Sequence, residues 1–316
     1  MKTSRRDFVI KSALAAAGMA YSYKSVGAID PTKLKPFNAL TNNEPAKICI
    51  FSKNLPELGY NEMASFVAEI GFDGIDVTVR PNGHVLPVNA ERDLPLVVEA
   101  AKKSGLKIYM ITTDIFDTED RFTEPILKTA ASFGIQHYRM GSISYDEKKS
   151  IPQNLADFKR KFKKLDKLNR RYNIRGECQN HSGIGFGAPV WDLWEVLKNM
   201  DPQWTGVQYD VFHATVEGAK SWPLGFNLLK PYIGTLDIKD FFWKKTDGKW
   251  ERVVTQLGEG MVDFKKYFAL IKENNMHGPF SIHCEYLTDK DDLHSKAAKM
   301  KKDLTTLRGW LKEAGL

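Results

Sequence analysis

The segment GPFSIHCEYL, residues 278–287, places a histidine and a glutamate two positions apart in an otherwise apolar run. Alternate side chains of a β-strand point to opposite faces, so His283 and Glu285 would share one face and Cys284 would take the other. Burying an imidazole and a carboxylate together is costly unless the protein uses them. The spacing therefore predicts a site for proton transfer or for binding a polar ligand.

Titratable and amide side chains also end the three apolar runs that precede this segment. These residues are Gln179, Asn180 and His181, then Asp210 and His213, and then Asp237, Lys239 and Asp240. An earlier run adds Arg80 and, in the loop that follows it, His84. Carboxylate, amide and imidazole groups can move protons and can also bind a divalent cation. Their recurrence at the ends of successive runs predicts one shared functional rim.

Eight short β-branched or aromatic runs are predicted as the strands that position these residues. They span residues 47–51, 74–79, 107–113, 137–142, 174–180, 207–214, 233–240 and 279–286. Stretches with apolar residues at helical spacing separate them, and a long amphipathic helix over 294–315 closes the chain. Eight strand–helix units in this order predict a single-domain (β/α)8 TIM barrel over 46–316, with its chemistry at the carboxyl ends of the strands.

A doubly wound open sheet is the competing arrangement for such an alternation. It lacks support, because no GxGxxG motif follows the first strand and no P-loop is present. The Asp247-Gly248 pair in WKKTDGKWERV, residues 243–253, predicts a small hairpin inserted after the seventh strand. Glu177, two residues deeper than Gln179, is interpreted as a core carboxylate paired with a basic residue at the barrel floor.

The three cysteines are predicted to be buried thiols. Cys49, Cys178 and Cys284 each lie inside an apolar run, and no CxxC spacing occurs. An odd count without regular spacing does not suit a disulfide framework.

The net charge of +7 is concentrated at the N-terminus. Five basic residues and one acidic residue lie in the first 28 positions, so the rest of the chain carries only +3. Such a charge predicts no phosphate-tracking surface, and nucleic acid is excluded as the default partner. No apolar run approaches the length needed to span a bilayer, so no membrane span is expected in the mature protein.

The N-terminal stretch SRRDFVIKSALAAAGMA joins a twin-arginine pair to a weakly apolar segment of small residues. It resembles a twin-arginine export signal, which implies a signal segment over 1–28, a linker over 29–45 and a periplasmic mature protein. A basic N-terminus without a targeting role is the alternative. Cleavage after Ala20 or after Ala28 fits equally.

The order of the motifs NHSG, YDVFHA, DIKD, LGEGMVDF and HCEY resembles the xylose-isomerase-like TIM-barrel superfamily of sugar isomerases and epimerases. The resemblance covers nearly the whole chain after the N-terminal segment. It implies that strands five to eight supply Glu, Asp, His and Glu. In the family these residues bind one divalent metal, and the two glutamates flank the substrate as acid and base.

Carrying this pattern across shows departures from it. The implied metal ligands are Gln179, Asp210, Asp237 and His283, of which only Asp210 keeps the family's residue type. This set of oxygen and nitrogen donors is acceptable to Mn²⁺, Mg²⁺, Co²⁺ or Zn²⁺. A neutral glutamine weakens the electrostatic hold on an ion. A polar barrel mouth that holds water and sugar hydroxyls, without a metal, is the alternative.

The resemblance also implies roles for the remaining rim residues. Glu285 is the predicted base, with a pKa raised by apolar surroundings, and Lys239, His213 and His283 would assist. The structural alternatives are that Glu285 only pairs with His283 and that Lys239 forms a rim salt bridge with Asp240. The residues predicted to bind substrate are His84, Arg80, Asn180, His181 and Trp243.

These observations predict an exported sugar isomerase or epimerase that removes a proton next to a carbonyl, with a divalent metal as Lewis acid. A lyase or hydratase acting on a keto-sugar or keto-glycoside would begin with the same step. A sugar-binding barrel without catalysis is the third possibility. The expected partner is a small carbohydrate, and the oligomeric state, including a homo-oligomer, is left open.

Overall fold

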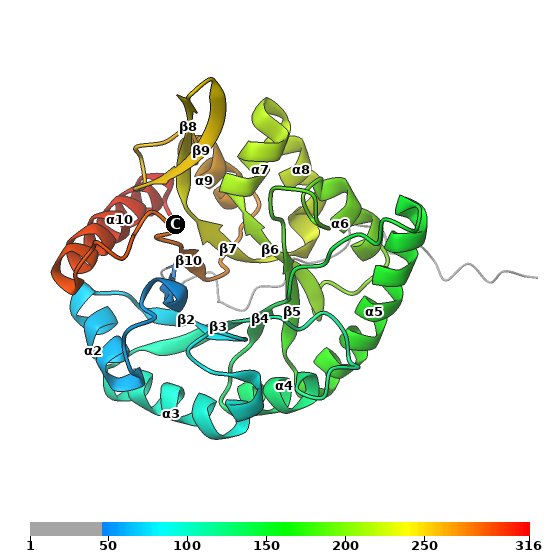
Figure 1. Cartoon of the computed structure of the whole chain (residues 1–316), viewed down its shortest axis with the longest axis horizontal. Coiled ribbons are helices and arrows are strands. Elements are labelled where there is room, and N and C mark those ends of the chain that lie inside the picture. The colour runs from blue at the N-terminus through cyan, green and yellow to red at the C-terminus, as the bar shows by residue number, and fades with distance from the viewer. Residues whose placement is uncertain (1–45) are drawn as a thin grey trace, which may run out of the picture. The chain divides into compact units, whose positions relative to one another are not determined.

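The computed structural model describes residues 46–316, in which parallel strands close into a barrel surrounded by helices (Figure 1). The barrel strands are β1 (Ile48–Phe51), β2 (Gly74–Val79), β3 (Lys107–Thr113), β4 (His137–Arg139), β5 (Arg175–Gln179), β6 (Thr205–Asp210), β7 (Ile233–Ile238) and β10 (Phe280–Ile282). Neighbours in sequence are neighbours in the barrel, and β10 closes it between β7 and β1. The predicted (β/α)8 barrel is confirmed. The predicted signal segment and linker lie outside the described residues.

Helices follow the strands and cover the outside of the barrel. They are α2 (Tyr60–Ile70), α3 (Ala90–Lys103), α4 (Thr123–Ser132), α5 (Ile151–Tyr172), α6 (Val190–Leu197), α7 (Val211–Gly218), α8 (Trp222–Leu229), α9 (Phe264–Glu273) and α10 (Leu293–Ala314). Within residues 46–316, none of these helices combines the length and the apolar character that crossing a membrane requires.

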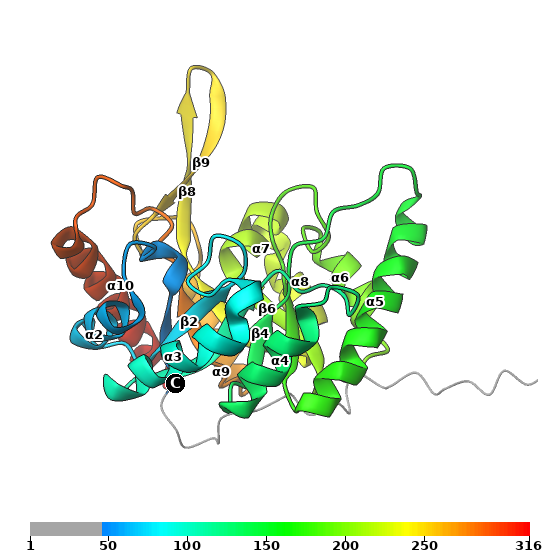
Figure 2. The ribbon, with the colours of Figure 1, turned by 60° about the horizontal axis from the view of Figure 1, so that its bottom comes forward.

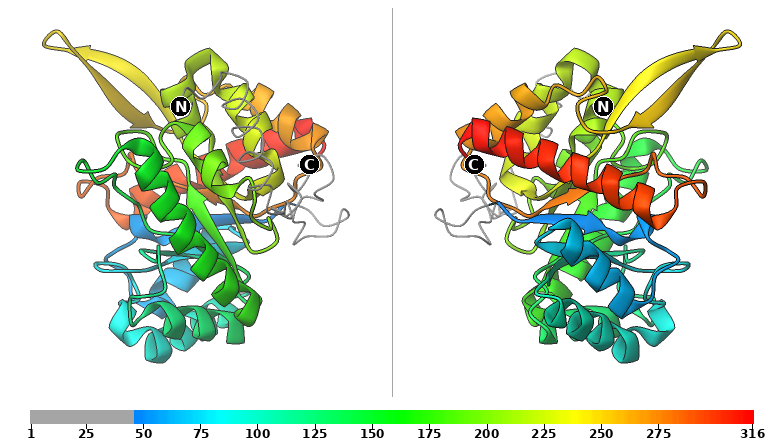
Figure 3. Two further views of the ribbon diagram at one scale, coloured as in Figure 1. Left: turned by 90° about the vertical axis from the view of Figure 1, so that its right-hand side faces the viewer. Right: turned by 90° about the vertical axis from the view of Figure 1, so that its left-hand side faces the viewer.

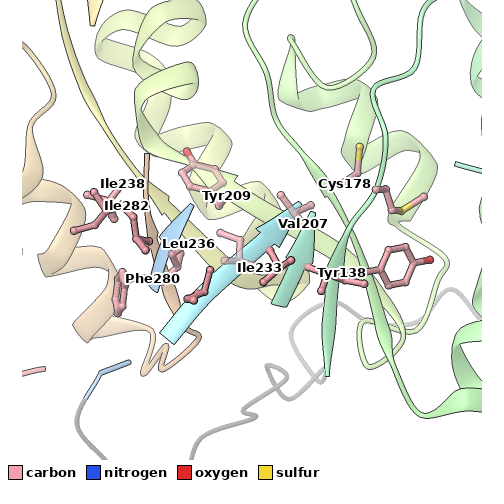
Figure 4. Close-up of a cluster of buried hydrophobic side chains, with 14 of the residues drawn as sticks. Tyr138, Cys178, Val207, Tyr209, Ile233, Leu236, Ile238, Phe280 and Ile282 are labelled. Carbon is pink, nitrogen blue, oxygen red and sulfur yellow. The ribbon is translucent and has the colours of Figure 1, made fainter. Parts of the chain in front are cut away.

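Alternate strand residues pack outward against these helices and form the core (Figure 4). The ring of Tyr209 on β6 meets Phe226 on α8 edge-on, with the ring centroids 5.2 Å apart. Phe280 on β10 packs against Phe268 on α9 in the same layer. Since outward positions are taken by apolar groups, the residues between them, such as Asp210 and Asp237, face the barrel interior.

Several strands are shorter than the sequence predicts. β6 ends at Asp210 rather than at residue 214, because the Asp210 carboxylate accepts a hydrogen bond from the His213 backbone N–H (3.2 Å) and so begins α7. His213 therefore lies on a helix and not at a strand end. The seventh predicted strand ends at Ile238, and Asp240 opens the next element.

The last barrel strand also ends early, at Ile282 instead of residue 286. The His283 N–H still donates to the Ile238 carbonyl (3.0 Å), which continues the ladder by one residue. The Glu285 N–H then donates to the His283 carbonyl (2.9 Å), and the chain turns. His283 and Glu285 are thus brought together by a turn, not by a shared strand face.

The predicted hairpin after the seventh strand is confirmed and is longer than expected. It consists of β8 (Asp240–Thr246) and β9 (Lys249–Thr255), which pair antiparallel. The turn residues Asp247 and Gly248 both have positive φ, at 51° and 81°, a conformation that Gly and Asp adopt more readily than other residues. Figure 2 shows the hairpin rising from the rim of the barrel.

A buried charge network fills the barrel beneath the rim. Glu177 lies 2.9 Å from Nδ1 of His137 and 3.3 Å from Nε of Arg175, and it accepts a hydrogen bond from Thr235. The predicted pairing of Glu177 with a basic residue is confirmed. All three cysteines of the chain are free and buried, as predicted.

Candidate active site

Gln179, Asp210 and Asp237 form one hydrogen-bonded cluster at the carboxyl ends of β5, β6 and β7. Asp210 is aligned with Asp237 in the β6–β7 register. The Gln179 amide nitrogen donates to Oδ2 of both aspartates, at 3.0 Å and 2.6 Å. Its amide oxygen accepts from Arg139 on β4 (3.2 Å), which fixes the orientation of the amide. Gln179 therefore presents N–H groups to the carboxylates and its oxygen to a cation.

Lys239 places a buried ammonium at the centre of the site. Its Nζ lies 3.0 Å from Oδ2 of Asp210 and 3.8 Å from Oε2 of Glu285, and 5.1 Å from the ring centroid of Phe212. The residue is only 2% exposed, so these two carboxylates balance its charge. The predicted alternative, a salt bridge with Asp240, is wrong. The Asp240 carboxylate instead accepts backbone N–H groups from Phe241, Gly258, Gly260 and Val262.

His283 stands between two acidic side chains. Its ring stacks on Phe51, with the centroids 4.3 Å apart, while Nε2 lies 3.3 Å from Oδ1 of Asp237 and Nδ1 lies 4.0 Å from Oε1 of Glu285. Neither ring nitrogen has a hydrogen-bond partner in the described part of the chain. Burial, aided by the ammonium of Lys239, lowers the pKa of His283 to about 3, so the imidazole is neutral at physiological pH.

Glu285 is the most accessible acid of the cluster, with 28% of its side chain exposed. Burial raises the pKa of this carboxyl, but Lys239 and other cations nearby, Lys53 among them, outweigh it and hold the pKa at about 2. The predicted raised pKa is therefore wrong. The surroundings of Glu285 are cationic as well as apolar, so the free protein carries it as a carboxylate.

Asp237 has the opposite character. It is fully buried, and both its oxygens accept amide N–H groups, from Gln179 and from Gln208 (2.7 Å). Burial raises its pKa to about 7, against the lowering effect of Arg139 and Lys239. Asp237 can therefore exist in both protonation states near neutral pH, as a proton donor or acceptor requires.

His213 joins this cluster from the first turn of α7. Its Nε2 lies 3.6 Å from Oδ2 of Asp210, and its Nδ1 shares a hydrogen bond with the Ser182 hydroxyl (2.8 Å). The ring of His181 packs against it, with centroids 3.9 Å apart. Burial, with Lys239 nearby, lowers the pKa of His213. His181 and His213 thus form a neutral wall beside Asp210.

The other residues predicted to bind substrate take different places. Both ring nitrogens of His84 are engaged by its own surroundings, at Leu55 O and Thr78 Oγ1. The side-chain amide of Asn180 makes two hydrogen bonds with the Asp210 backbone: its nitrogen donates to the carbonyl, and its oxygen accepts from the N–H. Arg80 lies over the Phe51 ring beside the cluster. Trp243 lies out on the hairpin and is 41% exposed. These four residues do not contact the central carboxylates directly.

Two charged residues that the sequence reasoning left out belong to the site. Asp76 on β2 is fully buried, accepts from Thr112 and Ser281, and lies 4.0 Å from Nε2 of His283. Arg139 ends β4 and anchors Gln179. Both interrupt short apolar runs, GIDVTV and HYRMGS, and that interruption is the signal that would have found them.

A pocket opens next to this cluster. Its lining combines apolar residues, such as Ile143 and Phe186, with groups that can donate hydrogen bonds: Arg80, Arg139, Ser142, Gln179, His181 and Ser182. Such a lining suits a ligand rich in hydroxyl or carbonyl oxygens.

The four predicted metal ligands, as they are arranged, do not fit a divalent ion. A metal needs free lone pairs directed at one point, but Gln179 turns its N–H groups toward the aspartates, and each oxygen of Asp237 already accepts one amide N–H. The remaining acid, Asp210, pairs with Lys239. In residues 46–316 no group of three or more His, Cys, Asp and Glu side chains is suited to hold a metal. Lys239 and Arg139 supply positive charge at this place.

Solved structures with the same fold include enzymes that act on sugars. The 3-keto-D-glucoside 4-epimerase YcjR from E. coli superposes with a TM-score of 0.64 at 15% identity, covering 84% of this chain and all of that one. The probable 3-DHS dehydratase AsbF from Bacillus anthracis gives 0.64 at 15%, covering 83% and 98%. A xylose isomerase-like TIM barrel protein from Mycobacterium smegmatis, in complex with magnesium, gives 0.62 at 17%, covering 84% and 98%. At these identities the likeness concerns the fold.

Sequence comparison places the chain more specifically. No curated protein sequence matches it. The profile of the xylose isomerase-like TIM barrel family matches residues 64–313, which include every residue of the carboxylate cluster described above. The chain belongs to the xylose isomerase-like TIM barrel family.

Proposed function

We propose that this protein is a sugar isomerase or epimerase that removes a proton from the carbon next to a carbonyl. The observation that carries the proposal is the placement of the Lys239 ammonium between a buried carboxylate and an accessible one, Asp210 and Glu285. Proton abstraction next to a carbonyl needs a base for the proton and positive charge for the oxygen that becomes negative. The base, Glu285, and the positive charge, Lys239, lie 3.8 Å apart.

Lys239 would donate a hydrogen bond to the substrate carbonyl oxygen, and Glu285 would accept the proton. A carboxylate with a pKa of about 2 is a weak base in the free protein. A substrate that engages Lys239 and displaces water from Glu285 would raise that pKa, because both the neighbouring charge and the solvation of the carboxylate are reduced. The basicity of Glu285 would therefore develop when substrate binds.

His283 lies between Glu285 and Asp237, which would be a second proton carrier. Its two nitrogens face Glu285 and Asp237, at 4.0 Å and 3.3 Å. A neutral imidazole can accept a proton at one nitrogen while it releases one from the other. Asp237, with a pKa of about 7, would then serve as the buried reservoir from which a proton returns to the intermediate.

Assistance by a divalent metal stays a prediction for Gln179, Asp210, Asp237 and His283. Such an ion, when bound, would act as a Lewis acid on the carbonyl. Binding would require Gln179 to turn its amide and Lys239 to leave Asp210. We therefore assign the electrophilic role to Lys239 and derive no step from a metal.

Elimination from a keto-sugar or keto-glycoside is the second candidate reaction, because it begins with the same proton removal. The neutral wall formed by His181 and His213 beside Asp210 could donate a hydrogen bond to the oxygen of a leaving group. We also propose export through the twin-arginine route to the periplasm, on the basis of the N-terminal motif alone.

The decisive experiment is deuterium exchange from solvent into a panel of keto-sugars and keto-glycosides. Label at the carbon next to the carbonyl establishes the reaction class, and release of an unsaturated product identifies elimination. Glu285→Gln should lower the exchange rate at least about 100-fold. Glu259→Gln, an exposed acid paired with Lys302, is the matched control and should exchange normally. Full exchange by Glu285→Gln would remove Glu285 as the base, and no exchange by the wild type would refute the reaction class.

A further inference from the structure

The β8–β9 hairpin projects from the rim (Figures 2 and 3). Its strand register divides its side chains between two faces. Directly paired residues of antiparallel strands lie on the same side of the ribbon. The pairs Phe241–Val254, Trp243–Arg252 and Lys245–Trp250 therefore form one face. The pairs Phe242–Val253 and Lys244–Glu251 form the other.

The first of these faces is the one that continues the site. At its base Phe241 is buried against Phe212, the ring that also lies beneath Lys239. Next along the face, Trp243 packs edge-on against Phe241, and the guanidinium of Arg252 lies 5.0 Å from the Phe212 ring. Arg252 also donates to the Ser182 hydroxyl, which in turn bonds His213 and lines the pocket.

Two tryptophans on this face are left open to solvent. Trp243 is 41% exposed and Trp250 is 65% exposed. Trp250 lies two residues before Arg252, which places it about 7 Å farther along the ribbon from the rim. A ring that stacked on Trp250 would therefore lie farther out along the hairpin than a ring held at Lys239.

We infer that the face formed by Trp243, Trp250 and Arg252 is an outer carbohydrate subsite, and that the substrate carries at least one sugar ring beyond the ring that reacts. The apolar C–H face of a pyranose stacks on an indole, and a guanidinium donates to its hydroxyl groups. The inference rests on the proposed function for the identity of the reacting ring. The subsite itself requires only binding.

The test is isothermal titration calorimetry with sugars that have no keto group and so cannot react. Methyl glucoside is compared with cellobiose, maltose and trehalose on the full chain, on Trp250→Ala and on Glu251→Ala. Glu251 neighbours Trp250 but points to the opposite face, so it is the matched control. At least one two-ring sugar should bind about tenfold more tightly than methyl glucoside. Trp250→Ala should abolish that advantage, and Glu251→Ala should keep it.

Equal binding of one-ring and two-ring sugars, or no measurable binding of any of them, would overturn the inference. So would an unchanged affinity in Trp250→Ala. Light scattering on the same samples tests the other occupant of this face, a second copy of the chain. A dimer that Trp250→Ala converts to monomer would reassign the face to a protein interface. Because binding needs no turnover, a failure of deuterium exchange with the sugar preference intact rejects the proposed reaction and leaves the subsite standing.

Discussion

Lys239 is a buried cation whose charge faces two carboxylates of different accessibility. This arrangement lets one ammonium hold Asp210 in place and, in the proposed reaction, donate a hydrogen bond to a substrate oxygen beside the accessible Glu285. Donation to the substrate depends on the ammonium group. The packing around Asp210 depends on the ammonium group and also on the volume of the side chain. A substitution that keeps the volume of the side chain separates the two.

We expect Lys239→Met to lower the rate of deuterium exchange about 100- to 1000-fold, the usual loss when a preorganised donor to a developing oxyanion is removed. Leaving Asp210 without its cation should also lower the melting temperature, which a thermal scan measures. The double variant Lys239→Met with Asp210→Asn should recover the melting temperature but not the exchange. Recovery of both would show that Lys239 acts only on the fold.

Asp237 should make stability depend on pH in one direction. Its pKa rises from an ordinary 3.8 to about 7 on folding, so between these values the folded chain holds a proton that the unfolded chain has released. Stability is therefore lost as pH rises from about 4 to about 7. Urea unfolding of the wild type and of Asp237→Asn should show the wild type losing stability relative to the variant across this range. A difference that does not change with pH would contradict the raised pKa.

For individual residues, the sequence predicted which side chains lie close together but not their protonation states. Gln179, Asp210, Asp237, Lys239 and His283 do lie together, because strand ends in a barrel converge. The pKa of Glu285 is lowered and not raised as predicted, because its neighbours Lys53 and Lys239 come from distant parts of the chain. Local apolar residues alone do not reveal such charges.

Among the elements, β7 shows how closely the barrel interior is fitted. A Cβ at Gly234 would overlap the carboxylate of Glu177 and lie 2.6 Å from Nη1 of Arg175. Glycine at this position leaves room for the buried ion pair. Gly309 in helix α10 differs from Gly234, because a Cβ there would have no atom within 4 Å.

Gly234→Ala should therefore destabilise the protein by about 1–3 kcal/mol, as overpacking of a core does. Gly309→Ala, the matched control, should stabilise it by about 0.5–1 kcal/mol because alanine favours a helix interior. Urea unfolding of both variants measures the difference. An unchanged Gly234→Ala would mean that the ion pair can shift without cost.

Element types were predictable from the sequence, but strand ends were not. Residue composition extended the sixth strand to Ala214, whereas the cap formed by Asp210 stops it four residues earlier. The hairpin was predicted from Asp247-Gly248, yet its strands reach back to Asp240 and on to Thr255. Side chain to backbone hydrogen bonds and pairing between strands decide these limits, and residue propensity does not record them.

For the whole molecule, the assignment of the electrophilic role to Lys239 predicts activity without a metal, in contrast to the metal assistance that the family pattern implies. Treatment with EDTA should leave the deuterium exchange and the melting temperature unchanged, and metal analysis should give far less than one ion per chain. Gln179→Glu, which adds a carboxylate to the two aspartates, should bind Mn²⁺ more tightly than the wild type in calorimetry. One ion per chain in the wild type, with a lower melting temperature after its removal, would instead support the predicted metal.

The export proposal has its own test. Replacing Arg5 and Arg6 by lysine in the full chain should keep the protein out of the periplasmic fraction, as fractionation and immunoblotting would show. A matched pair of changes, Lys2 and Lys11 to arginine, keeps the charge and leaves the arginine pair intact. Equal periplasmic amounts of both variants would contradict the twin-arginine route.

The buried network of Arg175, Glu177 and His137 has a kinetic consequence. Because these side chains fill the barrel below the carboxylates, substrate and product are expected to enter and leave from the rim side. Product and substrate would then use the same route to the site, and released product would compete with the next substrate molecule for binding. Progress curves should slow well before equilibrium, and the product should inhibit competitively.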